Sequence, residues 1–177
     1  MNDDLAAALE ILHPDAFGWA LHCCAGDVSQ AEDVLQNAYL KLAEGRAVHS
    51  GRSSIKTWWF GVIRFTAKEE ARRSKYRDTL ILRLWNGWAS TPPEVPAPSR
   101  QMELDEESTR LRAALGELPP RQAEVLHLVF YQDLSLSAAA SVLGISLGSV
   151  RQHYDRGKSR LRALLTSNPT SSHEGTR

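Results

Sequence analysis

Residues 134–165 read LSLSAAASVLGISLGSVRQHYDRGKSRLRALL, a pattern typical of two helices joined by a tight turn. The apolar positions of the first helix repeat at helical spacing, at Leu136, Ala139, Ala140 and Leu143. Ser135 can cap this helix, and Gly144 can end it because glycine adopts the left-handed backbone without strain. Ser146 can cap the second helix. Its apolar stripe is Val150, Tyr154, Gly157, Leu161 and Leu164.

The other side of the second helix is rich in cations and amides, namely Arg151, Gln152, His153, Arg156, Lys158, Arg160 and Arg162. This arrangement predicts a helix-turn-helix whose second helix reads duplex DNA. The alternative is a helical hairpin with a solvated basic face, which is what charge runs on helices usually are. The small residues of the first helix, the glycine at the corner and the arginine early in the second helix favour DNA binding.

The charge of the 177-residue chain sums to zero, but its distribution is uneven. Residues 1–44 hold eight acidic and one basic side chain, whereas residues 52–83 hold nine basic and three acidic ones. Residues 84–120 are again acidic, with six acidic and three basic side chains. Residues 121–165 are basic, with six basic and three acidic side chains. The basic blocks predict contact with nucleic acid, and the acidic blocks predict a protein-binding surface.

Several classes of function are disfavoured by what the sequence lacks. The two cysteines, Cys23 and Cys24, are adjacent, which suits neither a disulfide scaffold nor the spaced ligands of a zinc site. We therefore expect no metal and no cofactor. The six histidines are scattered and no catalytic spacing appears, so an enzyme is not expected. Without a signal peptide or a long apolar run, we expect a cytoplasmic chain with no direct membrane insertion.

The acidic N-terminal block predicts three helices. Short helices are expected at 5–12 and 15–24, separated by Pro14. The next helix has a buried stripe at Ala31, Val34, Leu35, Ala38 and Leu42. Its far face is polar except for Leu40. A leucine among polar residues on an outer face suggests a protein partner, although lone exposed leucines are common.

A long helix is predicted from Ile55, with Ser53 or Ser54 as its cap. Its basic residues are interleaved with aromatic ones, a combination that suits melted nucleic acid. Trp58 and Trp59 are predicted to be core residues, and Phe60 and Phe65 to be the rings that contact a base. The helix is expected to run on through an apolar stripe that packs between the two modules or against a regulator, at Leu80, Ile81, Leu84, Trp85 and Trp88.

Four prolines within residues 90–100 predict an extended linker. Helices are expected at 101–116 and 121–131, the latter with Ala123, Leu126, Val129 and Phe130 facing inward. The predicted fold class is all-α, with two small helical domains joined by a flexible linker and a helix-turn-helix in the second. The expected bounds are 1–84 for the first domain, 85–104 for the linker, 105–167 for the second domain and 168–177 for a disordered tail.

Two parts of the sequence resemble a known family. AEDVLQNAYLKLA with SIKTWWFGVIRFTAKEEARR resembles the second conserved region of bacterial sigma factors, and residues 118–165 resemble their fourth. With these two regions only, the chain resembles an extracytoplasmic-function (group IV) sigma factor. This resemblance implies a function as an alternative sigma factor that binds core RNA polymerase, directs it to specific promoters and helps to open the minus-ten element.

The resemblance also implies partners and sites. The partners are core RNA polymerase, promoter DNA and an anti-sigma factor. The residues implied to bind the polymerase are Asp33, Gln36, Asn37, Leu40 and Lys41. Those implied to bind the minus-ten element are Arg64, Phe65, Lys68, Arg72 and Arg73. Those implied to bind the minus-thirty-five element are Arg151, Gln152, His153, Arg156, Lys158 and Arg160. Phe65 stands where family members commonly have asparagine, and His153 where they have arginine.

Two other functions remain open from the sequence. A stand-alone helix-turn-helix regulator would bind DNA as a dimer, but it leaves the surface at residues 32–42 and the tryptophan-rich helix unexplained. A sigma-like decoy would bind an anti-sigma factor without activating transcription. A decoy predicts damaged DNA-facing residues, whereas both basic helices are intact, and Phe65 is the only support for a decoy.

Overall fold

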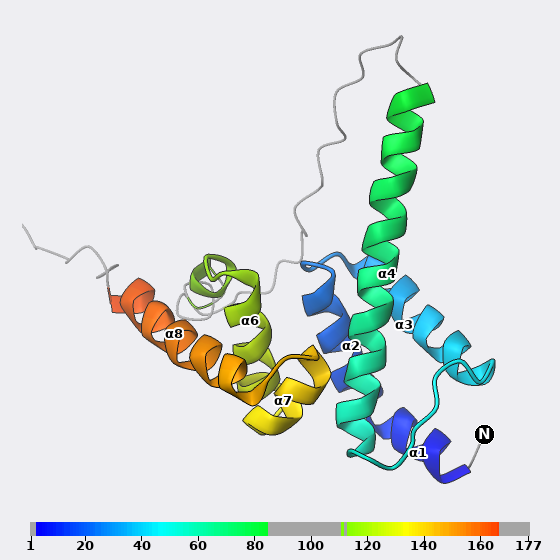
Figure 1. Cartoon of the computed structure of the whole chain (residues 1–177), viewed down its shortest axis with the longest axis horizontal. Coiled ribbons are helices and arrows are strands. Elements are labelled where there is room, and N and C mark those ends of the chain that lie inside the picture. The colour runs from blue at the N-terminus through cyan, green and yellow to red at the C-terminus, as the bar shows by residue number, and fades with distance from the viewer. Residues whose placement is uncertain (1–2, 85–110, 112, 167–177) are drawn as a thin grey trace, which may run out of the picture. The chain divides into compact units, whose positions relative to one another are not determined.

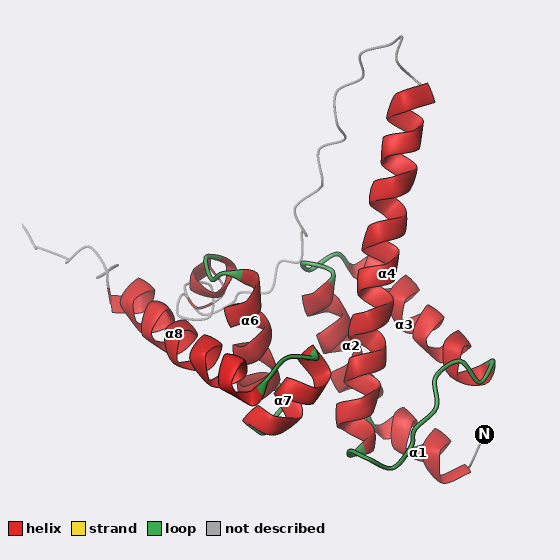
Figure 2. Ribbon diagram, viewed as in Figure 1, coloured by secondary structure: helices red, strands yellow, loops and turns green. Residues whose placement is uncertain are grey.

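The computed structural model describes residues 3–84, 111 and 113–166, and every element within them is a helix (Figure 2). The prediction of an all-α fold is therefore confirmed. The chain divides into two compact units, the first mainly within residues 1–100 and the second mainly within residues 101–177. The predicted linker and tail lie outside the described residues, so their bounds stay a prediction. Among the described helices, none combines the length and apolar character that crossing a bilayer requires.

The first unit comprises α1 (Asp3–Ile11), α2 (His13–Cys23), α3 (Val28–Ala43) and α4 (Ile55–Leu84) (Figure 1). Helices α2, α3 and α4 pack against one another, and α1 contacts α2 and α4. The core is aromatic, since Trp19, Trp59 and Phe60 are fully buried. The Trp19 indole Nε1 donates a hydrogen bond to the carbonyl oxygen of Phe60 at 3.0 Å, and their rings stack with centroids 6.1 Å apart. This core fixes α4 against α2.

Short-range capping explains where α3 and α4 begin. Asp27 accepts a hydrogen bond from the backbone N–H of Gln30 at 2.9 Å, and this bond lowers the pKa of the Asp27 carboxyl. Ser54 caps α4 by accepting from the N–H of Thr57 at 3.2 Å. Helix α4 continues to Leu84, as predicted. The last part of the expected apolar stripe, residues 85–88, lies outside the described residues.

The second unit contains a helical turn ending at residue 116, then α6 (Pro120–Leu126), η1 (His127–Tyr131), α7 (Leu136–Leu143) and α8 (Leu147–Thr166). Helices α7 and α8 form the predicted helix-turn-helix. The hydroxyl of Ser135 accepts a hydrogen bond from the N–H of Ala138 at 3.1 Å, and that of Ser146 accepts one from Ser149 at 3.1 Å. Gly144 has a φ of +62°, as expected for the residue that ends the first helix.

Helix α6 packs on α8 and leads into the π-helical turn η1. Such a turn holds one more residue than an α-helical turn, so the side chains that follow it are rotated. Leu128 is fully buried, whereas the Phe130 side chain is 54% exposed and stacks on Tyr154 with centroids 5.9 Å apart. The prediction that Phe130 faces inward is therefore wrong, because it assumed a continuous α-helix.

We expect Leu128→Ala to lower the free energy of unfolding of the second unit by about 2–5 kcal/mol, since it leaves a cavity in the core. Phe130→Ala should cost about 1 kcal/mol, because it removes one partly exposed ring contact. Amide hydrogen exchange across residues 113–166 of the full chain measures both. Equal losses in the two variants would contradict the π-helical arrangement.

Candidate nucleic-acid and protein interfaces

The outer face of α3 displays an apolar side chain between polar ones. Leu40 is 48% exposed, and Gln36 and Asp33, one and two turns before it, are also exposed. The three residues lie at i, i+3 and i+7, so they form one stripe along the helix. The predicted outward position of Leu40 is confirmed. An exposed leucine with polar neighbours is suited to a protein contact with an apolar centre and a polar rim.

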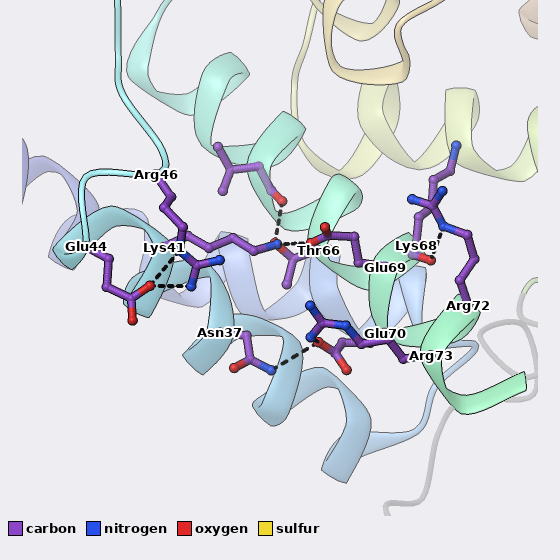
Figure 3. Close-up of polar contacts among 11 residues, drawn as sticks. Asn37, Lys41, Glu44, Arg46, Thr66, Lys68, Glu69, Glu70, Arg72 and Arg73 are labelled. Atoms are coloured by element: carbon purple, nitrogen blue, oxygen red, sulfur yellow. Dashed lines mark hydrogen bonds and ion pairs between the residues drawn. The ribbon is translucent and has the colours of Figure 1, made fainter. Parts of the chain in front are cut away.

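The other two residues expected on this surface, Asn37 and Lys41, turn towards α4 (Figure 3). The side-chain amide of Asn37 donates to Glu70 Oε1 at 3.5 Å. Lys41 Nζ donates to the hydroxyl of Thr66 at 2.9 Å and forms an ion pair with Glu69. Its hydrogen bond is the main cause that lowers the pKa of the Glu69 carboxyl. The five predicted residues thus divide into an exposed stripe and a pair that joins α3 to α4.

Sequence reasoning did not identify Thr66, Glu69 and Glu70 as partners of α3. A signal was present, because the adjacent acids Glu69 and Glu70 interrupt the otherwise basic run from Arg64 to Lys75. Burial reduces the hydration that stabilises a charged carboxylate, so a partly buried acid is expected to have a cation nearby. The interruption could therefore have indicated that this part of α4 faces another helix.

The exposed side of α4 carries cations around an aromatic ring. Phe65 is 57% exposed, and Lys68, Arg72 and Arg73 are exposed as well. Phe65, Lys68 and Arg72 line a shallow groove that continues to Lys75. The Nε of Arg72 donates to the Lys68 carbonyl at 3.3 Å, which keeps the guanidinium along the helix. Such a surface can bind phosphates with its cations and stack an unpaired base on its ring.

Two residues of α4 are less accessible than expected. Phe60 is fully buried against Trp19, so the prediction that its ring contacts a base is wrong. Arg64, one turn later on the same side, is only 6% exposed. The apolar stripe read from the sequence indicates the burial of neither position. Trp59 is a core residue as predicted, whereas Trp58 is half-buried and packs on His49 with centroids 5.2 Å apart.

The basic face of α8 is displayed as the sequence indicates. The exposed side chains are Arg151, Gln152, Arg156, Lys158 and Arg160. His153 is half-buried, and Lys158 Nζ lies 5.0 Å from the centroid of the Tyr154 ring. The opposite side includes the buried residues Val150 and Gly157, and α8 packs on α6 at Gly157. This contact fixes the rotation of α8, so that its cations and amides point away from the core.

Two family models match the chain. The model described as Sigma-70 region 2 matches residues 9–77, and the one described as Sigma-70, region 4 matches residues 114–163. The first match covers α2, α3 and most of α4, and the second covers α6, α7 and most of α8. Both basic helices therefore lie within regions that the family models describe.

Curated relatives are similar over most of their length. The chain is 29% identical over 167 residues to the ECF RNA polymerase sigma factor EcfG of Rhodopseudomonas palustris, covering 93% of this chain and 84% of that one. It is 30% identical over 137 residues to the RNA polymerase sigma factor YlaC of Bacillus subtilis, covering 77% of this chain and 78% of the relative.

Two solved structures share the fold. The sigma factor RpoE, in complex with the anti-sigma factor NepR from Bartonella quintana, gives a TM-score of 0.65 at 22% identity and covers 94% of this chain and 99% of that one. CnrH, in complex with the cytosolic domain of CnrY, gives a TM-score of 0.60 at 21% identity. The match covers 92% of this chain and 88% of that one. The ordered pair of matching regions and the relatives that match over most of their length lead to one conclusion: the chain belongs to the extracytoplasmic-function family of RNA polymerase sigma factors.

Proposed function

We propose that this sigma factor binds core RNA polymerase through the exposed stripe of α3 and binds promoter DNA through the basic faces of α4 and α8. The observation that carries the proposal is the exposure of Leu40 between polar residues, on the helix that packs beside the basic α4. A stand-alone regulator has no need of this apolar site. The polymerase supplies the catalysis, and the chain acts where the polymerase is, in the cytoplasm.

The polymerase surface consists of Asp33, Gln36 and Leu40, with Asn37 and Lys41 behind them. Leu40 supplies the apolar contact that a partner buries, and the flanking polar side chains set the orientation of the partner. Because interface energy concentrates in a few buried residues, we expect Leu40 to contribute more than its polar neighbours.

The minus-ten surface comprises the ring of Phe65 and the exposed cations Lys68, Arg72 and Arg73. The cations neutralise phosphates of the non-template strand, and the ring stacks on an unpaired base. Stacking of this kind is worth about 1–3 kcal/mol per base. Arg64 belongs to the same proposed surface, although its side chain would have to be uncovered before it could contact DNA.

The minus-thirty-five surface lies on α8. Arg151 and Gln152 come early in this helix, the part that enters the major groove in helix-turn-helix proteins. An arginine can pair with two acceptors of guanine and a glutamine with adenine, while Lys158 and Arg160 bind phosphates. His153 and Arg156 complete the set. We further propose an anti-sigma partner, which is supported by the solved structure of the sigma factor RpoE in complex with the anti-sigma factor NepR.

Run-off transcription tests the function directly. Purified chain is added to sigma-free core polymerase over a pool of host promoter fragments, and transcripts are mapped. Discrete transcripts that disappear with Asp33→Lys support the proposal. If no transcript forms and the chain does not bind core polymerase, a shift of duplex DNA by the chain alone would indicate a stand-alone regulator. The absence of such a shift would indicate a decoy.

Arg151→Ala tests the assignment of α8. We expect promoter-dependent losses of about tenfold to a hundredfold in transcript, because a bidentate contact to guanine is worth about 1–3 kcal/mol. Arg162→Ala is a matched control, since Arg162 is also an exposed arginine of α8 but lies near its C-terminal end. Equal effects of the two substitutions at every promoter would mean that Arg151 supplies charge alone and does not read a base.

A further inference from the structure

We propose that Lys41 positions the Phe65 ring for an unpaired base and does not itself contact the polymerase. This inference rests on the proposed function and assigns a different task to one residue of the expected polymerase surface. It follows from where the Lys41 ammonium lies, which is between α3 and α4 and not on the outer face of α3.

Three residues of α4 lie around the Lys41 ammonium, and Figure 3 shows two of them, Thr66 and Glu69. It donates a hydrogen bond to the hydroxyl of Thr66 at 2.9 Å and pairs with the carboxylate of Glu69. The Thr66 hydroxyl donates in turn to the carbonyl of Val62 at 2.9 Å, which leaves its lone pairs directed to the lysine. The ammonium also lies 5.3 Å from the centroid of the Phe65 ring, within the range of a cation–π contact.

The Lys41 and Phe65 side chains differ in their exposed fractions, and this difference indicates different roles. The Lys41 side chain is 12% exposed and that of Glu69 is 27% exposed, so little of the ion pair is available to another protein. Phe65 is 57% exposed. The cation is thus fixed on the inside by hydrogen bonds, while most of the ring stays accessible to a ligand.

The contact matters because an exposed ring is otherwise free to change rotamer. A ring that is held in one orientation loses less conformational entropy when a base stacks on it. With Lys68 and Arg72 lining the same groove, the fixed ring and the phosphate-binding cations are presented together. Lys41, a residue of α3, therefore sets the orientation of the Phe65 ring on α4.

The chain offers a matched control for this arrangement. Lys56 pairs with Asp15 at 2.8 Å, and its ammonium lies 5.6 Å from the centroid of the Phe60 ring. The geometry resembles that of Lys41, Glu69 and Phe65, but Phe60 is fully buried and cannot contact a base. Loss of Lys56 therefore removes a similar ion pair and ring contact without affecting the exposed ring.

The experiment uses holoenzymes assembled from core polymerase and full-length wild-type, Lys41→Met, Glu69→Gln or Lys56→Met chains. The template is a promoter fragment on which the wild-type chain gives a transcript. Affinity for core polymerase is measured by competition with labelled wild-type chain. Opening is measured at saturating core polymerase by permanganate reactivity of thymines in the melted region.

We expect Lys41→Met to reduce opening about threefold to tenfold, in line with the loss of a cation–π contact and its ion pair. Affinity for core polymerase should change by less than about twofold, because the exposed stripe of α3 remains. Glu69→Gln should reduce opening in the same direction, and Lys56→Met should not. In a Phe65→Leu background, Lys41→Met should have no further effect, since the ring it positions is absent.

A tenfold loss of core affinity in Lys41→Met, with normal opening once core polymerase is saturating, would overturn the inference in favour of a polymerase contact. So would equal opening defects in Lys41→Met and Lys56→Met, which would reveal a general loss of packing. If Lys41→Met does not fold, the double variant of Glu69→Gln and Phe65→Leu is compared with each single variant. Additive opening defects in this comparison would contradict a coupling between the ion pair and the Phe65 ring. Failure of the wild-type chain to give any transcript overturns the proposed function instead.

Discussion

Leu40→Asp is expected to abolish promoter-directed transcription while leaving the chain folded. Leu40 is 48% exposed on α3, so its loss should change the free energy of unfolding by less than about 0.5 kcal/mol. In the complex with polymerase, the same substitution removes the central apolar contact and buries an unpaired carboxylate. Such losses exceed about 3 kcal/mol, which corresponds to a more than hundredfold weaker complex.

The measurement is competition of the variant against labelled wild-type chain for core polymerase, with thermal unfolding recorded in parallel. Ile11→Asp is the control, because Ile11 is an even more exposed aliphatic residue of the same unit, at 80%, and lies on α1. It should bind core polymerase as the wild type does. Normal binding by Leu40→Asp would remove the main support for the proposed polymerase surface.

Gly157→Leu is expected to destabilise the second unit by about 3 kcal/mol or more and to prevent recognition of the minus-thirty-five element. A Cβ atom on Gly157 would lie 3.2 Å from Cγ and Cδ1 of Leu126 and 3.3 Å from Cβ of Gln122. A leucine at this position must therefore push α8 away from α6. Overpacking of a core costs about 1–3 kcal/mol or more, and here it also displaces the DNA-facing helix.

Hydrogen exchange of residues 113–166 and binding to minus-thirty-five duplexes measure the two effects. Gly148→Ala is the control, because Gly148 is in the same helix and its added Cβ would meet only the Ser146 hydroxyl oxygen, at 3.9 Å. It should increase stability by up to about 1 kcal/mol, since alanine has the higher helix propensity. Unchanged exchange in Gly157→Leu would mean that α6 and α8 do not pack closely at this position.

Local rules explain the parts of the structure that sequence reasoning predicted correctly. Ser135 and Ser146 cap their helices, and Gly144 has the positive φ that the turn requires, because these preferences depend on a few neighbouring residues. The buried stripe of α3 and the outward position of Leu40 follow from helical periodicity, which acts over one element.

Sequence reasoning did not identify the contacts between elements. Phe60 is buried because α2 supplies Trp19 as its partner, and nothing in the sequence near Phe60 indicates this. Lys41 has the spacing of a surface lysine, but its ammonium is held by side chains of α4 that lie more than twenty residues away. Periodicity identifies the faces of a helix, whereas the partner of each face depends on the tertiary arrangement.

The π-helical turn at His127–Tyr131 has a consequence for comparing related sequences. It accommodates one residue more than regular helix would, and each residue advances an α-helix by about 100°. A relative whose helix is regular at this point should therefore be one residue shorter between Leu126 and Gln132. An alignment that ignores this difference pairs Leu128, a core residue, with a position on a different face, and so transfers buried and exposed character to the wrong residues.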